Sequence, residues 1–235
     1  MKNPAYVHAI KNTLKNIDDI TEPDVLGLDS RVLIAHTPNK KIICKFDNEK
    51  MCRRDRYVSN IMRRAGINTP KMQMNNHNGI FFTTYEYNPN KTLAEWLELG
   101  FPRDLVYNVY CDAFDTIYKI SQISVPPCKQ TFEMFASNQD FAFNKILGTN
   151  VALYHNDLHA GNIIISNDWH FDGLIDISAV TLTTTNMFLA RTWIKYPAND
   201  FPDMLKYWAQ ISGQEMDEKR VECIHTITQT RGKIR

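Results

Sequence analysis

The stretch from His155 to Ile177 constrains the fold more than any other part of the sequence. It holds two short apolar runs, Ile163–Ile165 and Leu174–Ile175, with a polar segment between them. Short apolar runs bounded by turn residues are typical of buried strands. We therefore expect a small buried hairpin, with the polar residues that flank the two runs held together at one end.

The flanking residues that carry chemistry are Asp157, Asn162 and Asp176. Asn162 follows Asp157 by five positions, and Asp176 follows Asn162 by fourteen. Phosphoryl transfer from ATP needs a carboxylate to accept the proton of the attacking hydroxyl and oxygen ligands to fix Mg²⁺ on the phosphates. One loop with Asp157 and Asn162, facing Asp176, supplies all three groups. Asp and Asn are also common in ordinary turns, so the whole constellation, not a single spacing, favours the catalytic interpretation.

The stretch resembles the catalytic and metal-binding loops of the protein-kinase-like superfamily. That pattern is H-x-D-x-x-x-x-N followed by an Asp-initiated metal loop. The form D-L-H-x-G-N, at residues 157–162, is most similar to aminoglycoside-phosphotransferase-like and lipopolysaccharide-kinase-like members.

The resemblance implies a role for each residue of the motif. Asp157 would be the catalytic base, Asn162 and Asp176 the Mg²⁺ ligands, and His155 the histidine that braces the loop. Ile177-Ser178 stands where many members have Phe-Gly or a Trp. We expect this departure to change packing and not ligation.

The first ~85 residues are predicted to form a small antiparallel sheet with one inserted helix. A short amphipathic helix, Ala5–Ile17, precedes it. The expected strands are 31–35, 41–46, 71–74 and 79–85, with a helix over 49–65 and a turn at Asn75–Asn78.

Lys45 is the candidate phosphate-binding lysine of this sheet. The run Ile42–Phe46 resembles the third strand of kinases, whose lysine contacts the α- and β-phosphates. Taken alone, a lysine on a strand is more often simply solvated. Its resemblance-implied partner is a carboxylate on the following helix, either Asp55, which fits the register better, or Glu49 at the helix start.

Two further segments complete the predicted nucleotide site. Tyr85-Glu86-Tyr87 falls where the hinge between the lobes would lie, with its backbone placed to hydrogen-bond adenine. The sequence has no G-x-G-x-x-G, and Leu26–Val32, which contains Gly27 and Ser30, is the one candidate for the loop that covers the phosphates. It is loosely similar to the abbreviated loop of the small atypical kinase of the KEOPS complex, and an ordinary turn explains it equally well.

The remainder of the chain is predicted to be mostly helical. A capping box at Thr92 and Glu95 opens a short helix, and 102–123 reads as a longer one with an aromatic stripe suited to core packing. Helical patterns recur over 131–147 and from Thr183 to Lys233. Arg191 is a candidate brace for the catalytic loop, and a surface arginine is the alternative.

Two segments differ in which subfamily they resemble, the aminoglycoside-type enzymes or the small KEOPS kinases. Ser124–Asn150 is an insertion that aminoglycoside-type enzymes carry and the small KEOPS kinases lack. The basic tail Gln229–Arg235 is similar to the ending of those small kinases, although basic tails are more often just solvated.

Composition excludes several function classes. The 27 basic and 26 acidic residues give a net charge of +1, so a general affinity for nucleic acid or membranes is not expected, except through the basic tail. The 5 cysteines have no metal-ligand spacing, which favours reduced thiols in the cytoplasm. No secretory signal or membrane span is predicted.

These observations together predict an α+β protein with the two-lobe protein-kinase-like fold. An N-lobe over 1–87 would cover the nucleotide, and a compact C-lobe over 88–235 would carry the catalytic and metal loops. The predicted activity is ATP- and Mg²⁺-dependent phosphotransfer to a hydroxyl, leaning to a protein Ser/Thr or a glycan because the small C-lobe leaves little room for an acceptor subdomain. The alternatives are a small-molecule kinase of the aminoglycoside type, and a nucleotide-binding regulatory module or ATPase.

Overall fold

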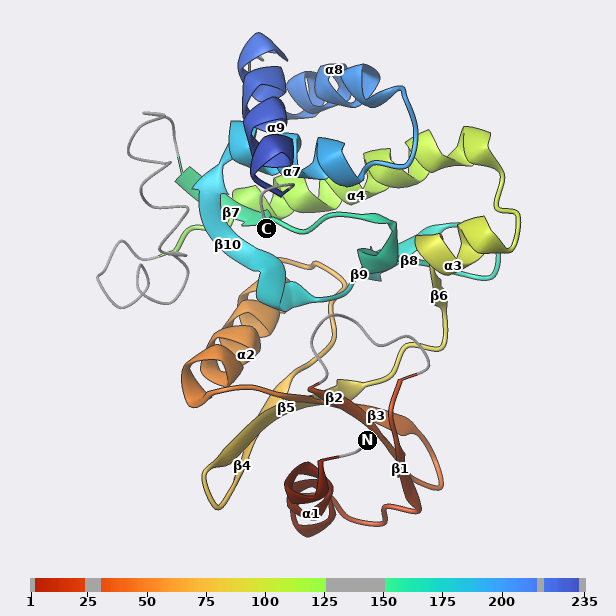
Figure 1. Cartoon of the computed structure of the whole chain (residues 1–235), viewed down its shortest axis with the longest axis vertical. Helices are drawn as coiled ribbons and strands as arrows, with labels where there is room; N and C mark the ends of the chain where they lie inside the picture. Colours follow the sequence, from red (N-terminus) through yellow and green to blue (C-terminus); the bar gives the residue numbers. More distant parts are fainter. Residues whose placement is uncertain (1–2, 24–30, 126–150, 215–217, 233–235) are drawn as a thin grey trace. The chain divides into compact units, whose positions relative to one another are not determined.

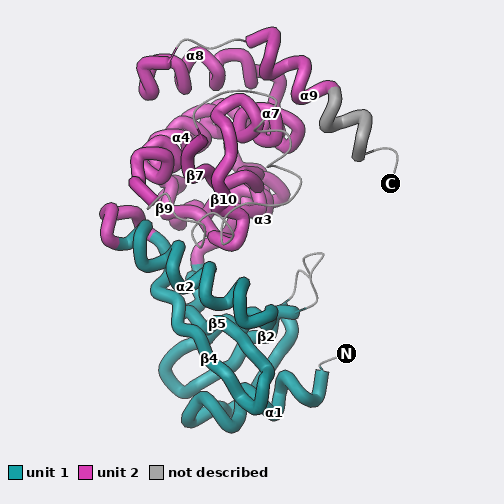
Figure 2. Tube along the Cα trace, turned by 90° about the vertical axis from the view of Figure 1, so that its left-hand side faces the viewer, with its two compact units in different colours: residues 1–63, 69–89 teal, residues 64–68, 90–235 magenta. Residues whose placement is uncertain are grey.

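A computed structural model of the chain describes residues 3–23, 31–125, 151–214 and 218–232. The chain divides into two compact units, one of residues 1–63 and 69–89 and the other of residues 64–68 and 90–235 (Figure 2). Each unit has its own sheet structure and its own buried core.

The first unit is built on a five-stranded antiparallel sheet that carries two helices (Figure 1). Its strand order is β1-β2-β3-β5-β4. The elements are α1 (Pro4–Thr13), β1 (Asp19–Thr21), β2 (Val32–His36), β3 (Lys41–Phe46), α2 (Glu49–Arg64), β4 (Gln73–His77) and β5 (Ile80–Glu86).

Strand β3 shows how the two faces of this sheet differ. Ile42, Cys44 and Phe46 join Ile10 of α1 in one apolar cluster. Side chains alternate between faces along a strand, so Lys45 lies on the face opposite to this cluster. The face of β3 that carries Lys45 is therefore not the face that packs against α1.

Two predicted boundaries in this unit were wrong. The first helix ends at Thr13 and not at Ile17, because Leu14 is extended and Asn16 has a φ of 56°. Strand β4 continues to His77, and the turn is Asn78–Gly79, with φ values of 50° and 84°. Two consecutive residues with positive φ form the tight turn that matches strand twist, and Asn-Gly is the pair that adopts it most readily.

The second unit combines two small sheets with a set of helices. One sheet pairs β10 with β7, and the other has the order β6-β8-β9. The elements are β6 (Lys91–Thr92), α3 (Leu93–Glu98), η1 (Arg103–Leu105), α4 (Val106–Ser121), β7 (Val151–His155), η2 (Ala160–Asn162), β8 (Ile163–Ile165), β9 (Phe171–Leu174), η3 (Ile177–Ala179), β10 (Val180–Thr184), α7 (Thr185–Lys195), α8 (Phe201–Ser212) and α9 (Glu218–Gly232).

An aromatic cluster forms the core of this unit. Trp208 of α8 is fully buried and its ring lies 5.7 Å from that of Phe114 and 5.4 Å from that of Phe188. Tyr154 of β7 stacks on Phe188 at 5.1 Å. The predicted aromatic stripe on α4 thus packs into the core through Phe114 and Tyr110, which are both buried.

One strand of this unit was missed. The sequence predicted helix from Thr183 onward, whereas Val180–Thr184 forms β10 and pairs with β7. The run Val-Thr-Leu-Thr-Thr is rich in β-branched residues, which favour strands. The predicted helices over 131–147 lie outside the described residues.

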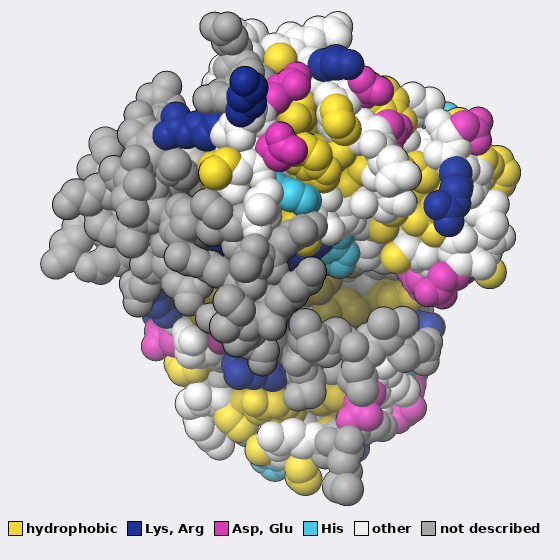
Figure 3. Space-filling view, turned by 45° about the horizontal axis from the view of Figure 1, so that its top comes forward, with side chains coloured by type: hydrophobic (Ala, Val, Ile, Leu, Met, Phe, Trp, Pro, Cys, Tyr) yellow, Lys and Arg dark blue, Asp and Glu magenta, His cyan; other side chains and the backbone are white. Residues whose placement is uncertain are grey.

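Charges of both signs are interspersed on the surface. Figure 3 shows basic and acidic side chains scattered over the face in view. Among the described residues no helix is both long and apolar enough to cross a membrane.

Candidate active site

The predicted catalytic loop begins at a buried histidine. His155 is the last residue of β7 and is 0% exposed, and its Nε2 donates a hydrogen bond to the carbonyl of Ile175 at 2.9 Å. Burial lowers the pKa of the imidazole, so the ring is neutral at pH 7. His155 thereby ties the start of the loop to the end of the β8–β9 hairpin, which is the bracing role that the resemblance implies.

Asp157 and Asn162 are in direct contact. The side-chain Nδ2 of Asn162 donates to the backbone carbonyl of Asp157 at 2.8 Å and lies 3.4 Å from its carboxylate Oδ2. This commits the nitrogen end of the amide to the loop. The oxygen end of Asn162 is therefore the end that can take a cation.

His159 reaches the other side of the Asp157 carboxylate. Its Nδ1 accepts a hydrogen bond from the Gly161 N–H at 3.0 Å, which leaves the proton of the neutral ring on Nε2. That Nε2 lies 3.5 Å from Asp157 Oδ2. A Cβ at residue 161 would come within 2.8 Å of His159 Cε1, so the glycine is what allows this ring position.

Sequence analysis missed a basic residue at the site. Lys195, the last residue of α7, donates a hydrogen bond from its ammonium group to Asp157 Oδ1. The hydrogen bond from His159 and the Lys195 charge hold the pKa of the Asp157 carboxyl well below its usual range, against the opposing effect of burial. Nothing in the local sequence signals this pair, because its members are 38 positions apart. For Arg191, one helical turn earlier, the bracing role stays a prediction.

Asp176 lies directly after the β8–β9 hairpin in a conformation that few residues adopt. Its φ of 55° and ψ of 52° are left-handed, and its Oδ1 accepts a hydrogen bond from the Ser178 hydroxyl. Asp and Asn tolerate this region better than other non-glycine residues. The neighbouring Ile177 is 1% exposed, so the departure from Phe-Gly is accommodated by packing.

The hairpin brings Asn162 and Asp176 to the same end. Ile163 pairs with Leu174, and the Ile175 N–H donates to the Asn162 carbonyl at 3.0 Å. An amide oxygen and a carboxylate are hard ligands of the kind that Mg²⁺ takes, typically one or two from protein with the rest from phosphates and water. Within the described ranges no group of three or more His, Cys, Asp or Glu could hold a metal. The amide oxygen of Asn162 and the carboxylate of Asp176 are donors of the type that Mg²⁺ accepts.

The predicted phosphate-binding residues lie in the first unit. Asp55 on α2 is 2% exposed, and its Oδ1 lies 3.6 Å from Arg54 Nε. The pKa of the Cys52 thiol is raised to about 11. Burial and the Asp55 carboxylate raise it, and the Lys45 ammonium acts in the opposite direction. Lys45 and Asp55 therefore lie within electrostatic reach of one thiol.

The alternative partner for Lys45 has a different environment. Glu49 is exposed and accepts a hydrogen bond from Arg53 Nε at 2.9 Å, one helical turn away. An exposed helix pair of this kind is an ordinary surface feature. Burial thus favours Asp55 over Glu49.

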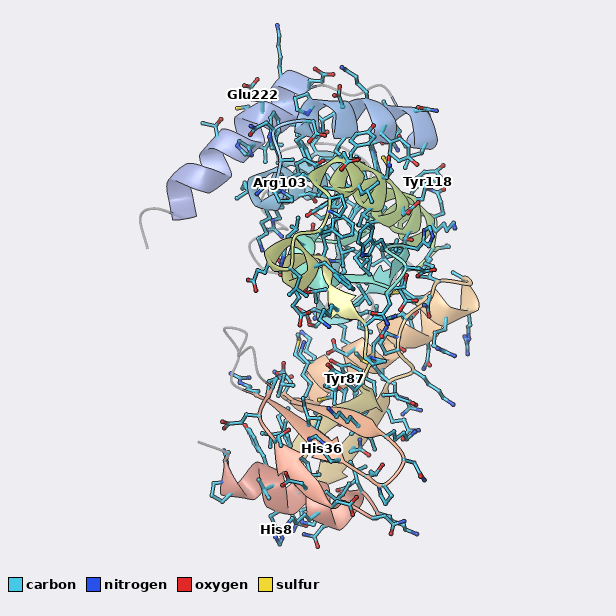
Figure 4. All side chains as sticks on the ribbon, turned by 90° about the vertical axis from the view of Figure 1, so that its right-hand side faces the viewer. His8, His36, Tyr87, Arg103, Tyr118 and Glu222 are labelled. Atoms are coloured by element: carbon cyan, nitrogen blue, oxygen red, sulfur yellow. The ribbon has the colours of Figure 1, made fainter. Side chains whose placement is uncertain are left out.

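The predicted hinge residues end strand β5. Glu86 is exposed and its Oε2 lies 3.2 Å from Lys40 Nζ, and Tyr87, labelled in Figure 4, is 39% exposed with Lys41 Nζ 5.5 Å from its ring centre. The Tyr87 N–H donates to the Lys41 carbonyl at 3.0 Å. Because backbone groups alternate along an antiparallel strand, those of Glu86 point to the other edge of β5. Gly27 and Ser30 lie outside the described residues.

Comparison with known proteins identifies the fold. No family model matches the sequence, and no curated protein matches it. The structure is similar to that of an aminoglycoside-3'-phosphotransferase of type VIII, with a TM-score of 0.66 at 11% identity, over 94% of this chain and 96% of that one. It is also similar to aminoglycoside phosphotransferase APH(2")-IIia in complex with GDP and kanamycin (TM-score 0.65, 13% identity, 97% and 90% coverage). A third similar structure is choline kinase LicA from Streptococcus pneumoniae (0.60, 14%, 94% and 89%). The chain therefore has the α+β fold of the protein-kinase-like phosphotransferases.

Proposed function

We propose that the protein is an ATP- and Mg²⁺-dependent phosphotransferase that moves the γ-phosphate to a hydroxyl group of a small molecule. The observation that carries this proposal is the arrangement of Asp157, Asn162 and Asp176. A carboxylate held as an anion lies beside an amide whose nitrogen is committed to the loop, and a second carboxylate follows at the same end of the hairpin.

Each residue then has a defined task in the transfer. The acceptor oxygen forms a bond to the γ-phosphorus, the bond from that phosphorus to the β,γ-bridging oxygen breaks, and ADP leaves. Asp157 orients the acceptor hydroxyl and takes its proton. Asn162 and Asp176 would hold Mg²⁺, which neutralises charge on the phosphates when bound. Lys45, positioned by Asp55, would contact the α- and β-phosphates, and the Glu86–Tyr87 backbone would receive adenine.

A small acceptor is favoured over a protein or glycan. The opposite expectation rested on the limited size of the C-lobe. The aminoglycoside-3'-phosphotransferase of type VIII is covered over 96% of its length by this chain, and the similar structures include enzymes named for aminoglycosides and for choline. A chain of this extent therefore needs no larger domain to act on a small alcohol, and nothing in the comparisons supports a macromolecular acceptor.

The test is release of ADP and transfer of labelled γ-phosphate with a panel of small alcohols. Asp157→Ala and Asp176→Ala are expected to lower kcat by at least about 100-fold, the usual contribution of a general base or a metal ligand. Asp168→Ala is the matched control, because Asp168 is exposed on the turn of the same hairpin. EDTA should abolish the activity.

Two results would contradict the proposal. One is equal activity in the native chain and both variants, which would separate turnover from these residues. The other is ATP binding with no turnover on any acceptor, which would favour the regulatory-module alternative.

A further inference from the structure

The carboxylate of Asp157 has an ionic partner that the proposed reaction does not use. One oxygen binds Lys195, and the other faces His159 Nε2 at 3.5 Å and Asn162 Nδ2 at 3.4 Å. An acceptor hydroxyl that donates its proton to Asp157 competes with these partners for the acceptor sites of the carboxylate. Lys195 is the partner that comes from outside the loop and its side chain is 43% exposed, so it is the one that can move.

Strand β10 and helix α7 have about equal lengths, and this brings Lys195 next to Asp157. Val180 of β10 pairs with His155 and Thr184 pairs with Val151, so β10 runs away from the catalytic loop. Five strand residues and the eleven residues of α7 each span about 16 Å. Helix α7 packs against β7 and β10, and its last residue is therefore back at the level of the loop.

Anchored aromatic rings hold the end of α7. Trp193 stacks on Phe201 at 5.2 Å and lies 4.7 Å from the His225 ring. Tyr196 packs edge-on against Tyr110 at 4.6 Å. The backbone at Lys195 is thus fixed between two packed residues, while its own side chain extends toward solvent and the carboxylate.

Displacement from Asp157 leaves an ammonium group that is available to pair with another anion nearby. We propose that Lys195 is an anion-binding group of the active site, which leaves Asp157 when the acceptor binds and pairs with a carboxylate or phosphate that the acceptor carries beside its reacting hydroxyl. This rests on the proposed phosphotransfer and names its substrate class as hydroxy acids or phosphorylated alcohols. A cationic alcohol such as choline would instead meet Lys195, the charged group on this side of Asp157, with like charge. The transferring phosphoryl group of ATP is the other source of anionic oxygens.

The test compares alcohols that differ only in charge. Sorbitol, gluconate and glucamine form one set, and glycerol, glycerate and 3-amino-1,2-propanediol form another. With saturating MgATP, the native enzyme should show a kcat/KM at least about tenfold higher for the acid than for the amine of each set. Lys195→Met should raise KM about tenfold more for the acid than for the neutral alcohol of each set, Lys195→Arg should keep the preference for the acids, and Lys195→Glu should reverse it.

Lys206→Met is the matched control, since Lys206 forms a comparable pair with Asp203 at 2.7 Å on α8. If Lys195→Met lowers kcat alike for all acceptors and for ATP hydrolysis without acceptor, the anion is the transferring phosphoryl group. If Lys195→Met matches Lys206→Met on every acceptor, or the native enzyme prefers the amines, the proposal is wrong.

A binding measurement separates this proposal from the proposed function. Calorimetric titration with gluconate should show about tenfold weaker binding to Lys195→Met than to the native chain. That difference without any Asp157-dependent turnover would retain Lys195 as an anion site and reject the phosphotransferase. Turnover that depends on Asp157, with equal gluconate binding by the native chain and by Lys195→Met, would retain the phosphotransferase and reject Lys195 as an anion site.

Discussion

Asp176 meets two demands that few residue types satisfy together. Its backbone is left-handed and its carboxylate is a proposed Mg²⁺ ligand. Alanine in the left-handed region costs about 1–2 kcal/mol, and asparagine visits it far more readily. Asparagine therefore keeps the conformation and removes the charge, which allows the two demands to be measured separately.

We expect Asp176→Asn to melt within about 2 °C of the native chain and Asp176→Ala to melt several degrees lower, since 1 kcal/mol corresponds to about 2–4 °C at this size. Both variants should lose at least about 100-fold in Mg²⁺-dependent turnover. Thermal unfolding and ADP release measure the two effects. An active Asp176→Asn enzyme would exclude the carboxylate as an essential metal ligand.

Burial sets the reactivity of the cysteines in the first unit. It raises the pKa of Cys44 to about 12 and, together with the Asp55 and Asp47 carboxylates, that of Cys52 to about 11. Only the thiolate reacts with alkylating agents. With iodoacetamide at pH 8, exposed Cys223 should be labelled at least about 100 times faster than either residue, as read by peptide mass spectrometry. Fast labelling of Cys44 in the folded chain would contradict the packing of α1 on β3.

At the scale of elements, the start of α3 rests on a reciprocal cap. The Thr92 hydroxyl accepts from the Glu95 N–H at 3.2 Å, and Glu95 Oε2 accepts from the Thr92 N–H at 2.7 Å. Thr92→Ala should lower the free energy of unfolding by about 1 kcal/mol, and Thr92→Ser, which keeps the hydroxyl, by a few tenths. Urea unfolding measures both, and equal losses would show that the methyl group and not the cap is responsible.

Local patterns predicted the elements whose causes are local. The capping box at Thr92 and the apolar runs of the β8–β9 hairpin are each contained in a few residues, and the structure confirms both. The turn at Asn78–Gly79 has an equally local signal, the Asn-Gly pair, but the asparagines before it also favour turns, and the predicted turn at 75–78 is therefore wrong.

Pairings between distant segments could not be predicted in the same way. β10 forms on β7 with 24 intervening residues between the two strands, from 156 to 179, and its β-branched residues favour a strand without indicating which strand it pairs with. The contact of Lys195 with Asp157 depends on the matched lengths of β10 and α7, which no short window of sequence contains. The motif therefore singles out the Asp157 carboxylate as a candidate base, whereas nothing in the sequence points to the cation that binds it.

For the whole molecule, the two units divide the proposed tasks. Lys45, Asp55 and the hinge belong to the first unit, and the metal ligands and the base belong to the second. The fold is shared with phosphotransferases at 11–14% identity. Such identity shows a common fold alone, so the division of tasks must be tested in this chain itself.

Ligand-induced stabilisation tests the division, because a ligand that binds only the folded chain raises its stability by an amount set by its affinity. MgATP at 100 times its Kd should add about 2.7 kcal/mol, or about 5–10 °C in Tm. Lys45→Met in one unit and Asp176→Asn in the other should each remove most of this shift, and EDTA should reduce it in the native chain. Asp157→Asn should keep the shift while losing turnover, because Asp157 is assigned to the proton and not to the nucleotide. Loss of the shift in Asp157→Asn would instead make this carboxylate part of the nucleotide site. A full shift in Lys45→Met would show that Lys45 does not contribute to nucleotide binding.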